Sequence, residues 1–86
     1  MRRTRRGLRR HERIQLTQSR QNSYPRRFRW RGRNYDVAAV QEAWTKMQRG
    51  PGRSARHYFR VRCTEGIYEI FRDTKLDTWY LAAQIS

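Results

Sequence analysis

The sequence predicts a small, mainly β domain, built as a curled antiparallel sheet or a half-open barrel of five to six strands. One observation is alternation, since Phe59, Val61 and Cys63 occupy every second position, as in a strand with one buried face. A second is the presence of turn residues, such as Gly32 and Gly66, between alternating segments. A third is length, because 86 residues can bury only one modest core. Curling such a sheet would also hide its edges.

Residues 1–11 are predicted to be a disordered basic arm, and residues 12–86 the β domain. The arm has one large apolar residue, Leu8, besides the first Met, so it offers almost nothing to bury. Residues 1–33 hold 13 Arg and one acid, giving +12, whereas residues 34–86 hold eight bases and six acids, giving +2. The excess charge is therefore local, as expected of a basic arm on an ordinary domain.

The first strand is predicted over residues 12–18, and a hairpin over residues 26–38. In the hairpin, Phe28 and Trp30 lie two residues apart and share one face, while the arginines between and beside them take the other. Gly32 supplies the turn, and apolar alternation resumes after it. The aromatic residues are thus assigned to the core and the arginines to solvent or a ligand.

Residues 38–48 fit two interpretations. Val40, Trp44 and Met47 follow helical spacing, and Asp36 precedes them where an N-cap would lie. A bulged strand that continues the hairpin would also bring the apolar residues inward. The pattern therefore allows either one short helix or a bulged strand, and a Gly- and Pro-containing loop follows.

The last third predicts a β-meander with strands over residues 57–64, 67–73 and 78–85. Their links are short, so the strands must pair as antiparallel neighbours. Alternation places Tyr58 and Tyr80 on the outer face of this sheet.

Four segments of the chain resemble a small bacterial domain of unknown function: "FRWRGRNYDV", "YFRVR", "GIYEIFRD" and "WYLAAQI". This small domain is similar to the closing module at the C-terminus of inactive Y-family-polymerase-like proteins of mutagenic DNA repair. The resemblance covers roughly residues 12–86 and consists of core aromatics and turn glycines, so it implies a fold more than an activity. The chain departs from the pattern in its "AAQIS" ending and in lacking a long tryptophan-rich loop near residues 49–56.

Neither catalysis nor metal binding is predicted. The two histidines and Cys63 lack the partners and the spacing of a catalytic group or a metal site, so we expect a non-enzymatic protein without cofactor. Cys63 lies in an inward-facing row and is predicted to be a buried, inert thiol. No apolar run is long enough for a membrane span, and no secretory signal follows the first arginines, so the cytoplasm is the expected location.

The arginines support a functional prediction: a non-catalytic module that binds DNA or RNA through backbone phosphates, with little sequence preference. Guanidinium groups suit bidentate phosphate contacts, and small barrels bind single strands along charged grooves with stacking aromatics. The arm would supply long-range attraction, and the outer faces of the hairpin and of residues 57–64 would form a fixed groove. The predicted contact residues are Arg2, Arg3, Arg5, Arg6, Arg9, Arg10, Arg13, Arg27, Arg29, Arg31, Arg33, Tyr58, Arg60 and Arg62.

The alternative is a protein-interaction module that docks on a DNA-repair or other complex, with the basic arm as an accessory. An acidic protein surface would attract the arm as phosphate does, whereas the apolar face needed for membrane insertion is missing. Docking on a protein would instead require an exposed apolar patch.

Overall fold

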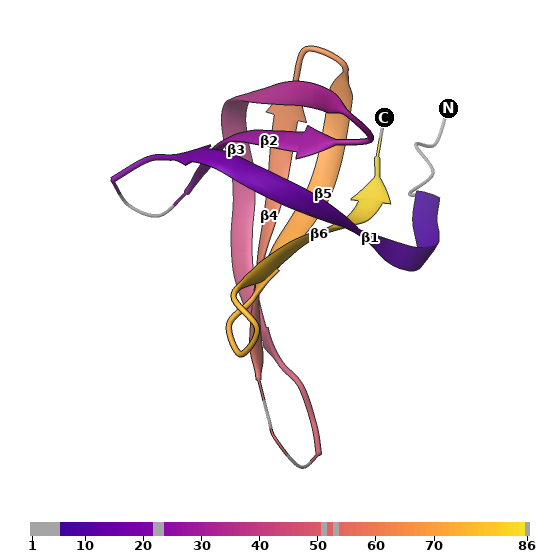
Figure 1. The fold of residues 1–86 in the computed structure, drawn as a ribbon, viewed down its shortest axis with the longest axis vertical. Helices are drawn as coiled ribbons and strands as arrows, with labels where there is room; N and C mark the ends of the chain where they lie inside the picture. Colours follow the sequence, from indigo (N-terminus) through magenta and orange to yellow (C-terminus); the bar gives the residue numbers. More distant parts are fainter. Residues whose placement is uncertain (1–5, 22–23, 51, 53, 86) are drawn as a thin grey trace.

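The computed structural model describes residues 6–21, 24–50, 52 and 54–85, with the backbone alone for residues 6–10. Six antiparallel strands close into a barrel in the order of the sequence (Figure 1). The strands are β1 (Arg6–Ser19), β2 (Pro25–Trp30), β3 (Arg33–Met47), β4 (Ala55–Cys63), β5 (Gly66–Asp73) and β6 (Thr78–Gln84). The predicted fold class is confirmed, and the barrel is closed rather than half-open. No helix long and apolar enough to cross a membrane occurs among the described residues.

Strand β1 closes the barrel by pairing with both of its neighbours in turn. Its first part pairs with β6 as far as Ile14, which lies opposite Trp79, and its last part pairs with β2 from Gln15, which lies opposite Arg29. Figure 1 shows the strand crossing the barrel diagonally. The change of partner at Ile14 and Gln15 makes this part of β1 a corner of the barrel.

Residues 6–11, which the sequence assigns to a disordered arm, form the beginning of β1. Arg6 and Gly7 pair with the end of β6, and the pairing is irregular between Gly7 and Glu12. The ring of His11 lies edge-on to Phe71, with 5.0 Å between ring centroids. Ladder hydrogen bonds and this ring contact hold the segment despite its charge. Residues 1–5 of the predicted arm lie outside the described residues.

The predicted hairpin of β2 and β3 is confirmed, with a two-residue turn at Arg31 and Gly32. Both residues have positive φ angles, 51° and 74°. This combination is typical of the type I′ turn, whose twist matches that of the flanking strands. The turn pairs Trp30 with Arg33 and Phe28 with Tyr35. The rings of Phe28 and Tyr35 stack with 5.1 Å between centroids.

Residues 38–47 belong to strand β3 and Gln48 follows its end, so the helical interpretation is wrong and the bulged strand is confirmed. The pairing with β4 shifts by one residue between Val37 and Ala39 and again between Val40 and Glu42. Asp36 caps no helix and instead forms an ion pair on the outer face of the hairpin.

The apolar residues form two clusters. The interior of the barrel holds the main core of Ile14, Phe28, Trp30, Tyr35, Val37, Phe59, Val61, Cys63, Tyr68, Ile70 and Leu81. A second cluster consists of Tyr58, Phe71 and Ala82, with Trp44 and Tyr80 packed against them. Tyr58 is therefore buried, with 6% of its surface exposed, and it is not the exposed aromatic that the sequence predicts. Its ring stacks on Trp44 and contacts Phe71, because the outer side of these strands carries an apolar layer of its own.

Candidate nucleic-acid interface

The predicted groove requires the arginines of the hairpin and those of β4 to lie side by side on two neighbouring strands. They do not, because most of the hairpin arginines precede β3. Strand β3 lies between β2 and β4. On β3, Asn34 is opposite Arg29 and Asp36 is opposite Arg27. A polar residue and an acid therefore interrupt the predicted row of positive charge.

Two of the predicted contact residues, Arg27 and Arg60, form ion pairs within the sheet. Arg27 Nε lies 2.5 Å from a carboxylate oxygen of Asp36, directly across the hairpin. Arg60 lies between two acids, 3.3 Å from Glu42 on β3 and 3.0 Å from Glu69 on β5. Glu69 is buried, so the half-buried Arg60 is needed to compensate its charge. Because both guanidinium groups are already paired with carboxylates, they are poorly suited to bind a phosphate.

Arg31 is held beside the turn by Glu12 of β1. Its Nε and Nη2 atoms donate to the two carboxylate oxygens at 2.9 and 2.7 Å, a bidentate arrangement. The same guanidinium lies 4.8 Å from the ring centroid of Trp30, whose Nε1 also donates to Glu12. The hydrogen bonds that Arg31 donates to Glu12 lower the pKa of Glu12 and raise the pKa of Arg31. One face of Arg31 thus remains accessible while its position is fixed.

A groove of about 850 Å³ crosses the corner of the barrel where β1 changes partner. Arg13 and Arg29 line it, with Arg31 and Gly32 at the hairpin turn and Asp77 with Thr78 before β6. Arg13 and Arg29 are exposed, and within the described residues neither forms an ion pair. Three arginines therefore surround one concave surface, and no acid among the described residues compensates the charge of Arg13 or Arg29.

The other predicted contact residues are scattered. Arg33 and Arg62 are exposed but lie on β3 and β4, away from this groove. Arg6, Arg9 and Arg10 lie on β1, and their side chains are outside the described part of the chain. Arg2, Arg3 and Arg5 precede the described residues altogether.

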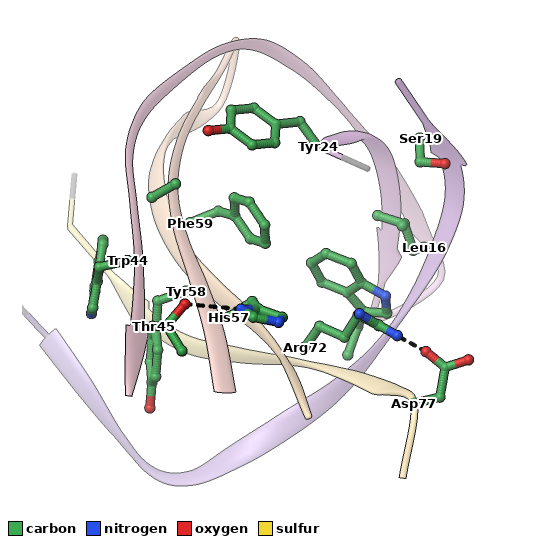
Figure 2. Close-up of a pocket in the computed structure, with 12 residues that line it drawn as sticks. Leu16, Ser19, Tyr24, Trp44, Thr45, His57, Tyr58, Phe59, Arg72 and Asp77 are labelled. Carbon is green, nitrogen blue, oxygen red and sulfur yellow. Dashed lines mark hydrogen bonds and ion pairs between the residues drawn. The ribbon is translucent and has the colours of Figure 1, made fainter. Parts of the chain in front are cut away.

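A second concavity, of about 620 Å³, lies within the ring of strands and is lined in part by residues near the end of β3 and the start of β4 (Figure 2). We call it the mouth. Its apolar lining comes from Leu16, Tyr24, Phe59 and Trp79, and its polar lining includes His57 and Arg72. No pattern in the sequence was interpreted as predicting this site. Tyr24 next to Pro25 could have indicated it, because an aromatic residue in a polar loop usually packs against other apolar residues.

The buried thiol and phenol of the core have perturbed acidities. Burial raises the pKa of Cys63 to about 12, and burial also raises that of Tyr68. Both groups therefore stay neutral near pH 7, and the structure confirms that Cys63 is buried. Within the described residues, no three His, Cys, Asp or Glu side chains gather in a way that could hold a metal ion.

Comparison with known proteins places the chain in a family without assigning it an activity. No curated protein and no solved structure matches it. The family model of a domain of unknown function, DUF6504, matches residues 8–84, from the irregular part of β1 to the end of β6. The chain therefore belongs to the DUF6504 family.

Proposed function

We propose that this protein is a non-catalytic module that binds nucleic acid through backbone phosphates. The observation that carries the proposal is the groove at the β1 corner, where Arg13 and Arg29 face solvent without a carboxylate partner among the described residues. A net charge of +14 would add long-range attraction for a polyanion.

The geometry supports a narrower contact than the sequence alone suggests. Arg27 and Arg60 are committed to acids, whereas Arg13 and Arg29 are not. Arg31 has a bidentate carboxylate partner, Glu12, which compensates its charge, so Arg31 is not proposed as a phosphate contact. Phosphate contacts carry little sequence information, so binding with little sequence preference is expected.

The alternative, a module that docks on a protein of a DNA-repair complex, has less support. Among the described residues the exposed large apolar side chains are Met47 and Leu76, and two side chains supply little apolar surface for docking. The resemblance to the closing module of Y-family-polymerase-like proteins suits either function, because a bacterial repair accessory in the cytoplasm could contact DNA, protein or both.

The proposal predicts that two groove arginines control the salt dependence of binding. The test variant is the double substitution Arg13→Gln with Arg29→Gln. The matched control, Arg27→Gln with Arg62→Gln, removes the same charge outside the groove. We expect the test variant to bind a labelled single-stranded oligonucleotide about tenfold more weakly, the loss of roughly 1.4 kcal/mol. The slope of log K against log salt should also fall by about 1.4, since each phosphate contact on a single strand contributes about 0.7.

Fluorescence anisotropy between about 50 and 200 mM salt measures both quantities. The control should lose far less affinity and keep its slope. If the two double variants behave alike, the groove is not the phosphate site. If no oligonucleotide binds at the lowest salt, or if polyglutamate binds as tightly as DNA, the nucleic-acid function is rejected in favour of an acidic protein partner.

A further inference from the structure

The mouth of the barrel is a pocket with aromatic walls. The ring of Phe59 stands between those of Tyr24 and Trp79: the Tyr24 ring meets it edge-on at 5.4 Å, and the Trp79 ring stacks on it at 5.6 Å. Phe59 is buried, whereas Tyr24 and Trp79 are only half-buried. Figure 2 shows the Tyr24 and Phe59 side chains inside the ring of strands. Two rings thus stay accessible in a concavity of about 620 Å³, which gives a flat ligand a surface to stack on.

Polar groups held in place line the same pocket. His57 Nδ1 and the hydroxyl of Thr45 are 3.0 Å apart, and Arg72 Nε donates to Asp77 at 2.8 Å (Figure 2). His57 and Arg72 face each other across β4 and β5, so they form one polar side of the mouth. A pocket with stacking surfaces and a few fixed polar groups suits a flat heterocycle, which buries its faces and hydrogen-bonds through its edge.

The mouth adjoins the arginine groove. Leu16, Asp77 and Trp79 line both concavities, so these three residues form the boundary that a chain bound along the groove would cross to reach the mouth. Phosphates would lie near Arg13 and Arg29, and a base extending from that backbone would meet Trp79 first. The bases of a duplex are paired and stacked inside the helix, and only an unpaired base can be turned outward in this way.

We propose that the mouth binds an unpaired nucleobase of a single strand whose backbone lies in the groove. The inference rests on the proposed function and adds to it a preference for single-stranded over double-stranded nucleic acid. Stacking tolerates any base, so it is compatible with little sequence preference.

The first test compares a short oligothymidine with an abasic oligomer of equal length, which carries the same phosphates but no bases. We expect the unaltered protein to bind oligothymidine about tenfold more tightly, in the range that base–aromatic stacking provides. It should also bind it more tightly than a duplex of the same length. This comparison needs no substitution, so it cannot fail through misfolding.

The second test fills the mouth. Ala43 lies on β3 opposite Phe59, is exposed and lines the pocket, so Ala43→Leu would occupy it without adding a ring or a charge. The matched control is Ala38→Leu, at an exposed position of the same strand that does not line the pocket. Ala43→Leu should remove most of the preference for oligothymidine over the abasic oligomer, and Ala38→Leu should retain it.

Each outcome separates the inference from the function on which it rests. Equal binding of the two oligomers, with weaker binding of both by the groove variant, overturns the base site and leaves phosphate binding intact. A preference for bases that Ala43→Leu does not reduce also overturns it, because the bases then stack elsewhere. Binding of neither oligomer overturns both proposals.

Discussion

At the scale of single residues, the turn of the first hairpin depends on a glycine. Gly32 has a φ angle of +74°, and a Cβ added there would have no atom within 4 Å. Gly32→Ala should therefore reduce the free energy of unfolding by about 1 kcal/mol through backbone strain alone, without a steric clash. Urea denaturation measures the change.

Asparagine is the matched control at this position, because it tolerates the left-handed region better than alanine. Gly32→Asn should lose clearly less stability than Gly32→Ala. Equal losses in the two variants would show that the backbone angle is not the cause.

The residue scale also shows what sequence can say about the candidate site. Alternation correctly predicted that Arg29 is exposed, since it lies between the inward-facing Phe28 and Trp30. Arg13, predicted only as part of the basic run, is exposed beside the buried Ile14. Alternation could not tell them from Arg27 and Arg60, because the acids that neutralise these two lie on neighbouring strands. Which acid lies opposite which arginine depends on strand register, and bulges that are invisible in composition set that register.

At the scale of elements, strand β3 explains why a strand can look like a helix in sequence. Two bulges each add a residue that has no partner on β4, so the residues opposite the buried row of Cys63, Val61 and Phe59 are Val37, Val40 and Ala43. These are three apart, a spacing close to that of a helix face. Trp44 then falls on the outer side, where it stacks on Tyr58. The spacing of apolar residues alone could not distinguish a helix from a bulged strand. Pairing with β4 makes this segment a strand.

The early start of β1 leads to a prediction about His11. If residues 6–11 are part of the barrel, His11→Ala should reduce the free energy of unfolding by roughly 0.5 to 1 kcal/mol, the contribution of an aromatic pair such as that with Phe71. Thermal and urea unfolding measure it. Gln15→Ala, an exposed change on the same strand, should stay within about 0.5 kcal/mol of the unaltered protein. A disordered arm would make the two substitutions equivalent.

At the scale of the whole molecule, closure of the barrel creates both concavities. The groove exists because β1 leaves β6 and joins β2 at one corner, and the mouth exists because closure brings residues of β1, β3, β4, β5 and β6 around one opening. Alternation predicted five to six strands and a curled sheet, and the turns predicted which strands are neighbours. Closure itself depends on long-range pairing between the two ends of the chain, and no local pattern in the sequence reports it.

Closure also makes the ionisation of Cys63 a reporter of global unfolding. The thiol is 5% exposed and its pKa in the folded protein is about 12, compared with about 8.5 in an unfolded chain. Because the folded pKa is the higher one, the unfolded state loses its proton first, and stability falls as pH rises between the two values. Between pH 7 and about 9.5 the unaltered protein should lose roughly 1 kcal/mol through this group.

Urea denaturation under reducing conditions at the two pH values tests this, with Cys63→Ala as the comparison. The substitution shortens a buried side chain, so its stability at pH 7 is not the readout; the readout is the change with pH within each protein. Tyr68 is present in both proteins, and because burial is the largest cause of its raised pKa and Cys63 only a smaller one, most of its contribution is common to the two. Cys63→Ala should therefore lose about 1 kcal/mol less than the unaltered protein as the pH rises. Parallel losses would mean that the thiol ionises as easily in the folded barrel as in the unfolded chain, and hence that the barrel admits water to its core.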